Sequence, residues 1–300
     1  MPRRPQPIKS ELLEKAMSPA ILDAAWGDLA RERTPWSPKT DRERLKLNFP
    51  RHLLECREDV LSGAYRPHPL RQTVIPQAGG RKRVITLQYL RDKLVQRALW
   101  LALRPHAESR FHPCSFAYRR GMSANMARRF VQTMAQRGYR CLFYARIERF
   151  FDNVPQKRLQ RLLNAVTEDK AVSKLTKLWL AQHHDHEDRR TGARYGVAEG
   201  TVLSPFYCNL YLNQLDKALT KNRVTFARFA DRLVLMAEDE KTSERGIRSL
   251  SRQLAKLELS LHYRSGRVLP GSTGMTFAGE ESARLLETRN ANFDRTIPCL

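Results

Sequence analysis

Cysteine is scarce in this chain of 300 residues, and the few cysteines are scattered. They form no C-x-x-C pair and show no disulfide-framework spacing, so neither a stapled secreted domain nor a paired-cysteine metal site is indicated. We expect buried thiols in a reducing compartment, the cytoplasm. The five positions are Cys56, Cys114, Cys141, Cys208 and Cys299.

Long hydrophobic runs are also missing. The richest apolar stretch, 94–103, is interrupted by Arg97 and is too short to span a bilayer. The segment from Met1 to Lys9 is basic and proline-rich, without the apolar core of a signal peptide. We therefore expect no membrane insertion and no secretory signal in this sequence.

Acidic residues are few relative to basic ones. Lys and Arg number 54 against 31 Asp and Glu, which gives a formal net charge of +23. Solubility of a small domain needs a magnitude of only about 2–8. The basic residues recur along the whole chain, so the folded surface should attract a phosphate backbone, with an anionic membrane surface as the lesser alternative.

The first half of the chain reads as helices with one hairpin. Two β-like stretches, 72–76 and 83–87, flank a Gly79-Gly80 turn whose tip is basic. The polar composition of segment 183–194 is typical of a loop or hairpin. Its histidines lack the further ligands that a tetrahedral metal site would need, so we do not assign one there. Apolar spacing and helix-stop signals predict helices over 11–33, 42–62, 89–104, 123–136, 157–166 and 170–182.

Three later segments carry the most specific pattern. A β-rich apolar run, 141–147, leads to Phe150-Phe-Asp-Asn153. Gly200-Thr-Val-Leu-Ser-Pro205 then opens a helix that continues through Asp216. Residues 225–237 are interrupted by Ala230-Asp-Arg232, which predicts strand, turn and strand. A helix over 247–257 and a short closing strand, Thr276–Gly279, complete the prediction.

In this order the three segments resemble the palm of a reverse transcriptase. Upstream motifs resemble the fingers of group II intron, diversity-generating and CRISPR-associated members of that family. These motifs are Tyr65-Arg-Pro-His-Pro, the Gly79-Gly80 hairpin, Asp92-Lys-Leu-Val-Gln96 and Ser115-Phe-Ala-Tyr-Arg119. The resemblance covers about residues 12–279.

The resemblance implies an α+β fold, a right-hand polymerase fingers and palm with an antiparallel palm sheet. We expect a basic arm at 1–10, a fingers-like region at 11–137, a palm at 138–280 and a short tail at 281–300. The helical thumb of the family is then absent or minimal.

The family's metal site is degenerate in this sequence. The resemblance implies Mg²⁺ held by one Asp on the first palm strand and two adjacent Asp at the palm hairpin. The corresponding residues here are Arg146, Asp231 and Arg232, so one carboxylate remains and two guanidinium groups replace the others. Arginine keeps its charge and has no acceptor lone pair. Binding of Mg²⁺ is therefore doubtful, and Glu148 or Asp152 are the substitute carboxylates to consider. Glu148 lies two residues past Arg146, so we expect it to share the strand face of Arg146.

Residues for the incoming nucleotide are partly retained. The resemblance assigns triphosphate contacts to Lys82 and Arg83, and further nucleotide contacts to Arg119, Phe151 and Asp152. Glu199 stands where the family commonly has Gln.

These expectations lead to a reverse transcriptase-like protein that binds RNA or an RNA–DNA primer–template and has lost, or nearly lost, polymerisation. A protein partner would then supply a thumb or an active polymerase. Two alternatives remain open: an active RNA-directed DNA polymerase that uses substitute carboxylates, and a maturase-like structural RNA-binding module.

Overall fold

The computed structural model describes residues 10–76, 82–183, 186–262 and 267–270. It divides the chain into two compact units, each built from two stretches of sequence. Unit 1 comprises residues 1–109 and 154–207, and unit 2 comprises residues 110–153 and 208–300. Within the described ranges, no helix is both long and apolar enough to cross a bilayer.

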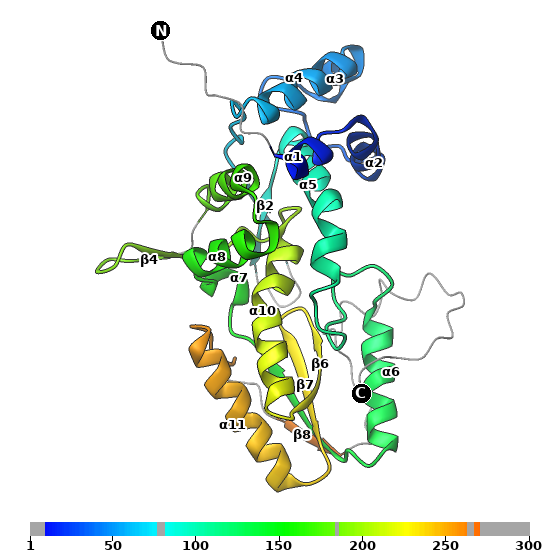
Figure 1. The fold of residues 1–300 in the computed structure, drawn as a ribbon, viewed down its shortest axis with the longest axis vertical. Coiled ribbons are helices and arrows are strands. Elements are labelled where there is room, and N and C mark those ends of the chain that lie inside the picture. Colours follow the sequence, from blue (N-terminus) through cyan, green and yellow to red (C-terminus); the bar gives the residue numbers. More distant parts are fainter. Residues whose placement is uncertain (1–9, 77–81, 184–185, 263–266, 271–300) are drawn as a thin grey trace. The chain divides into compact units, whose positions relative to one another are not determined.

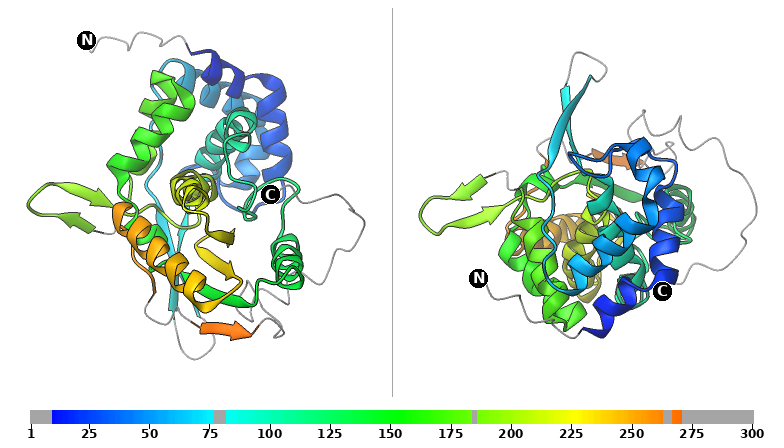
Figure 2. Two further views of the ribbon diagram at one scale, coloured as in Figure 1. Left: turned by 60° about the horizontal axis from the view of Figure 1, so that its bottom comes forward. Right: turned by 90° about the horizontal axis from the view of Figure 1, so that it is seen from above.

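Unit 1 is mainly helical and carries two small hairpins. Its helices are α1 (Glu11–Ala16), α2 (Pro19–Leu29), α3 (Arg42–Leu47), α4 (Phe49–Leu61), α5 (Leu90–Glu108), α8 (Gln156–Thr167) and α9 (Lys170–Leu180). Strands β1 (Arg71–Pro76) and β2 (Lys82–Leu87) form the predicted antiparallel hairpin. Strands β4 (His186–Asp188) and β5 (Ala193–Tyr195) form a second hairpin, which projects away from α8 in Figures 1 and 2.

Local signals explain where several helices begin. The side chain of Ser10 accepts a hydrogen bond from the amide of Leu13 and caps α1, while Pro19 starts α2. The single helix predicted over 11–33 is therefore two helices. Asp169 caps α9 by accepting from the amides of Ala171 and Val172.

Unit 2 is an antiparallel sheet with helices on both sides. The strands are β3 (Cys141–Arg146), β6 (Thr225–Phe229), β7 (Arg232–Ala237) and β8 (Arg267–Pro270), in the order β6-β7-β3-β8. The helices are α6 (Ala124–Gln136), the short α7 (Phe150–Asn153), α10 (Ser204–Lys221), whose first turn belongs to unit 1, and α11 (Glu240–Lys256). Figures 1 and 2 place α11 and α6 on opposite sides of the sheet.

The strand register decides which side chains share a face. Arg228 of β6 pairs with Leu233 of β7, so both point to the same face, and Leu235 follows two residues later. A Cβ placed on Gly246 of α11 would meet Leu235, and Arg228 contacts Asp216 of α10. Helices α10 and α11 therefore cover one face of the sheet. The opposite face carries Arg146, Arg232 and their alternating neighbours.

Strand β8 was not predicted from the sequence. It pairs antiparallel with β3, with Tyr144 opposite Arg267. The predicted closing strand at Thr276–Gly279 lies outside the described residues.

Candidate functional site

Two arginines lie directly opposite each other beside the tight turn of unit 2. Arg146, the last residue of β3, is the register partner of Arg232, the first residue of β7. Residues directly opposite in an antiparallel pair project from the same face. The turn between β6 and β7 consists of Ala230, whose φ is 56°, and Asp231. The amide of Ile147 donates to the carbonyl of Asp231 over 2.9 Å, which fixes the turn against the end of β3.

The one carboxylate at this turn is already engaged. Nε of Arg146 lies 3.3 Å from Oδ2 of Asp231, and the two side chains are 49% and 22% exposed. Two residues before Arg146, the partly buried Tyr144 shares its strand face. Burial raises the pKa of the Tyr144 hydroxyl, Arg232 and Arg146 lower it, and Asp231 raises it. These four side chains form what we call the arginine cluster.

The neighbouring carboxylates have other partners. Strand β3 ends at Arg146, so Glu148 lies in the following turn and does not continue the strand face, contrary to the expectation from spacing. Its amide donates to the carbonyl of Ser260, and its carboxylate lies 3.6 Å from Nε2 of His262. Oδ2 of Asp152 is 2.6 Å from Nε of Arg149. Across the described ranges, no group of three or more His, Cys, Asp or Glu side chains could hold a metal ion.

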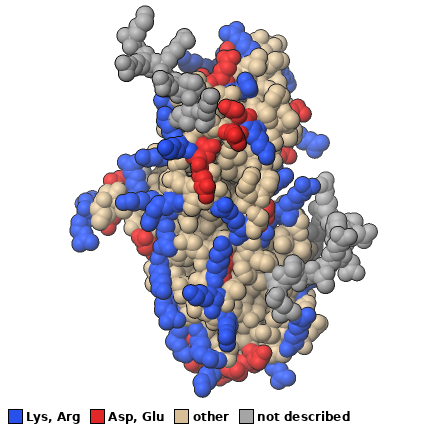
Figure 3. All heavy atoms as spheres, viewed as in Figure 1, with Lys and Arg blue, Asp and Glu red and all other residues tan. Residues whose placement is uncertain are grey.

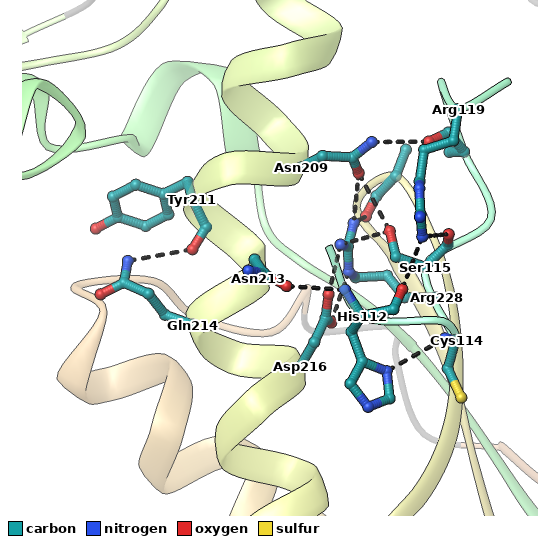
Figure 4. A network of polar contacts seen from close by, with 12 residues as sticks. His112, Cys114, Ser115, Arg119, Asn209, Tyr211, Asn213, Gln214, Asp216 and Arg228 are labelled. Carbon is teal, nitrogen blue, oxygen red and sulfur yellow. Dashed lines mark hydrogen bonds and ion pairs between the residues drawn. The ribbon is translucent and has the colours of Figure 1, made fainter. Parts of the chain in front are cut away.

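Arg119 and Phe151 are both engaged within unit 2. Nη1 of Arg119 donates to the carbonyls of His112 and Ser115 over 2.8 and 3.0 Å, as Figure 4 shows. Its guanidinium also lies over the ring of Phe111. Phe151 packs edge-on against Phe150, with ring centroids 5.2 Å apart. Arg119 therefore holds its own loop in place.

A buried charged network supports the turn from the covered face of the sheet, and sequence reasoning missed it. Arg228 and Asp216 are both 0% exposed. Nε and Nη2 of Arg228 donate to the two oxygens of Asp216 over 2.8 and 2.6 Å (Figure 4). Nη1 donates to Oδ1 of Asn209 and to the carbonyl of Ala230, and Nη2 also donates to Oγ of Ser115.

This network satisfies all five N–H donors of the Arg228 guanidinium. Burial alone would lower the pKa of Arg228, but the charge and hydrogen bonds of Asp216 raise it. Because Ala230 precedes Asp231, the network anchors the turn that carries the carboxylate of Asp231. The sequence signal that could have indicated this network is Arg228 itself, a charged residue at an inward position of a largely apolar strand.

Motifs that are far apart in sequence meet inside unit 1. Oη of the buried Tyr65 donates to Oδ1 of Asp92 over 2.5 Å, and Nε1 of Trp179 donates to Tyr65 Oη. The amide of His68 donates to the other oxygen of Asp92. The Tyr65-Arg-Pro-His and Asp92 motifs therefore form one structural unit built around a buried carboxylate.

The loop before α10 is held from β2 and α5. Gln88 Oε1 accepts from the amide of Val202, and Gln96 Oε1 accepts from the amide of Leu203. The carbonyl of Glu199 accepts from the amide of Thr86 in β2, which places Glu199 beside this strand. The backbones of Lys82 and Arg83 belong to β2, whereas their side chains lie outside the described part of the structure.

Comparison with known proteins gives consistent matches. The family model "Reverse transcriptase (RNA-dependent DNA polymerase)" matches residues 75–264. Protein YkfC of Escherichia coli is 27% identical over 293 residues, covering 84% of this chain and 76% of that protein. The group II intron-encoded protein LtrA of Lactococcus lactis is 27% identical over 245 residues, covering 81% of this chain and 37% of that protein.

A solved structure, a partial Cas6-RT-Cas1–Cas2 complex, is similar with a TM-score of 0.49 and 20% identity, covering 82% of this chain and 43% of that one. The chain thus spans about three quarters of YkfC but well under half of LtrA.

Proposed function

Because this chain belongs to the reverse transcriptase family, we propose that it binds RNA or a primer–template and has lost DNA synthesis, wholly or nearly so. The observation that carries the proposal is the pairing of Arg146 with Arg232 beside Asp231. In this proposal the sheet of unit 2 serves as the palm, and the hairpin of β1 and β2 belongs to the fingers. The boundaries of 11–137 for fingers and 138–280 for palm stay part of the proposal.

The electrostatics of the arginine cluster oppose a pair of divalent cations. The family's Mg²⁺ ions would activate a primer hydroxyl and stabilise the leaving group. Three carboxylates would present a charge of −3 to them, whereas Asp231 with two arginines presents +1. Oδ2 of Asp231, one of the two oxygens that a metal would need, already lies 3.3 Å from Nε of Arg146. The residues present do not fit the ions, so no catalytic step is assigned to them.

Substitute carboxylates are poorly placed to restore the site. Asp152 is paired with Arg149, and Glu148 approaches His262. Recruiting Asp152 would break its ion pair with Arg149, and recruiting Glu148 would require the turn after β3 to rearrange. An active polymerase based on Glu148 or Asp152 is therefore the weaker reading, and the test below distinguishes it.

The nucleic-acid role rests on charge and on the family. A net charge of +23 suits a phosphate backbone. The name of LtrA links that relative to a group II intron. For this chain we propose structured RNA or an RNA–DNA primer–template as partner, with a protein partner that supplies a thumb or an active polymerase.

Primer extension on an RNA template, with Mg²⁺ and then with Mn²⁺, tests the loss of synthesis. The unaltered chain should run beside the double variant Arg146→Asp plus Arg232→Asp. We expect no extension from the unaltered chain and measurable extension from the double variant, because three carboxylates would again face the metal position. Extension by the unaltered chain would overturn the proposal and direct attention to Glu148 and Asp152.

A matched control separates the site from general charge. The variant Arg128→Asp plus Arg129→Asp makes the same charge change at two exposed positions of α6. It should stay silent, like the unaltered chain. Tight binding of structured RNA without preference for a recessed primer end would favour the maturase-like module over a primer–template binder.

A further inference from the structure

The exposed face of α11 carries an unusual row of cations. Five Lys and Arg residues follow one another at intervals of three or four residues, so they project from one side of the helix. All five are exposed: Lys241, Arg245, Arg248, Arg252 and Lys256. At 1.5 Å per residue, the row is about 22 Å long. Figure 3 shows Lys and Arg gathered over α11 and beside the lower part of α10.

The end of α10 extends this row. Oγ of Ser249 in α11 accepts from Nδ2 of Asn222, which follows α10 directly. Lys221 directly precedes Asn222, and Lys217 lies one helical turn earlier on α10; both are exposed. We call these seven cations on α11 and α10 the basic face.

Acidic residues lie mainly at the start of α11, where Glu238 and Asp239 precede the helix, whereas its middle and last turns carry cations. Helix α11 itself contains two acidic residues, Glu240 and Glu244, against five cations. Glu244 pairs with Arg248 over 3.3 Å, but both side chains are about two-thirds exposed, and such pairs are weak and readily exchanged. A merely solvated helix usually intersperses charges of both signs. The imbalance indicates an anionic partner.

The other side of α11 is occupied by its own fold. Leu250 and Leu254 are buried, and the backbone of Gly246 approaches Val224 and Leu235. A helix that binds a bilayer surface inserts its apolar face into the lipid. This helix has no apolar face to insert, so the chemistry favours a phosphate backbone over a membrane.

The geometry points to a second nucleic-acid surface: we infer that the basic face binds the phosphate backbone of structured RNA. It lies over the covered face of the sheet, whereas Arg146 and Arg232 project from the opposite face. The inference rests on the proposal that the chain binds RNA, but it is independent of whether the chain synthesises DNA. A chain with RNA contacts on both sides of the sheet could bind a folded RNA while a primer–template occupies the other side.

Fluorescence anisotropy with a blunt-ended RNA hairpin, titrated at several salt concentrations, tests the inference. The variant combines Arg245→Gln, Arg248→Gln and Arg252→Gln; glutamine is a good helix former, and all three side chains are exposed. Losing three phosphate contacts should reduce the slope of log K against log salt by about 2–3. Extrapolated from 1 M salt, that slope corresponds to about a 50- to 300-fold loss of affinity at 0.15 M.

The control removes the same charge elsewhere. The control variant combines three substitutions on α3 and α4: Arg44→Gln, Lys46→Gln and Arg51→Gln. Lys46 already pairs with Glu43, and Arg51 with Glu55. We expect the control to bind almost as the unaltered chain does, with unchanged circular dichroism for both variants. Equal losses in the two variants would overturn the basic face while leaving RNA binding intact. Absence of RNA binding by the unaltered chain would instead overturn the proposed function.

Vesicles of phosphatidylserine and phosphatidylcholine provide the remaining arm. The unaltered chain should bind them no better than the Arg245, Arg248 and Arg252 variant does. Stronger vesicle binding that depends on these arginines, together with unchanged RNA binding, would assign the face to membranes and refute the inference.

Discussion

Replacing Asp216 with alanine should strongly destabilise unit 2. The change removes the carboxylate that receives two hydrogen bonds from Arg228, while the guanidinium stays 0% exposed. Breaking a buried ion pair on one side costs about 3–5 kcal/mol, because an uncompensated charge remains inside. With a urea m-value of about 2 kcal/mol/M, the unfolding midpoint would fall by about 1.5–2.5 M.

The companion double variant makes this prediction specific. Combining Asp216→Leu with Arg228→Met removes both charges and keeps apolar volume, which in other proteins is often neutral or stabilising. Here Ser115 and Asn209 would lose a partner, and so would the carbonyl of Ala230, so only part of the stability should return. The double variant should therefore be more stable than Asp216→Ala alone.

The assay must report on unit 2. All four tryptophans, Trp26, Trp36, Trp100 and Trp179, lie in unit 1, so their fluorescence reports that unit alone. Far-UV circular dichroism during urea unfolding, with hydrogen exchange of β6 and β7, follows the affected sheet. If Asp216→Ala lowers the free energy of unfolding by less than about 1 kcal/mol, the argument is refuted, because Arg228 must then be hydrated or paired with another anion.

Two further predictions concern the same unit. Gly246→Ala should stabilise the protein by up to about 1 kcal/mol, because alanine favours a helix. The added Cβ would meet Val224 and Leu235 at 3.6 and 3.8 Å, which are ordinary contact distances. A lower melting temperature of the variant would contradict this prediction. Burial lowers the pKa of His112 below its usual 6.5; the charge of Asp216 opposes this effect, whereas that of Arg228 adds to it. Nδ1 of His112 accepts a hydrogen bond from the amide of Cys114. The unfolded chain then binds more protons, so stability should fall as the pH drops below about 6.5, and His112→Gln should flatten that dependence of the urea midpoint; identical pH profiles would contradict the assignment.

Much of unit 2 could be predicted from the sequence because its strands alternate and its turn is polar. The interruption Ala230-Asp231 gave the turn between β6 and β7, and the apolar run before Phe150 gave β3. The sequence resemblance alone also predicts that Arg146 and Arg232 stand where the family has acidic residues. That the two arginines are register partners depends on strand pairing, which the structure supplies.

Other features depend on long-range packing that local patterns do not contain. The inward position of Arg228 is visible in the strand pattern, but its partner Asp216 lies on a helix and is brought beneath it only by the fold. Glu148 was expected to share the face of Arg146, but β3 ends before it reaches Glu148. The interleaving of the two units, in which residues 110–153 separate two stretches of unit 1, follows from contacts between distant segments.

Binding of Mn²⁺ to the unaltered chain and to the variant Arg146→Asp plus Arg232→Asp tests the central claim most directly. Electron paramagnetic resonance detects the bound ion without requiring primer, template or thumb. We expect no binding at Asp231 in the unaltered chain, and binding in the double variant that disappears when Asp231→Asn is added. Binding by the unaltered chain that Asp231→Asn abolishes would contradict the account, because the arginine cluster would then tolerate the metal it is proposed to exclude.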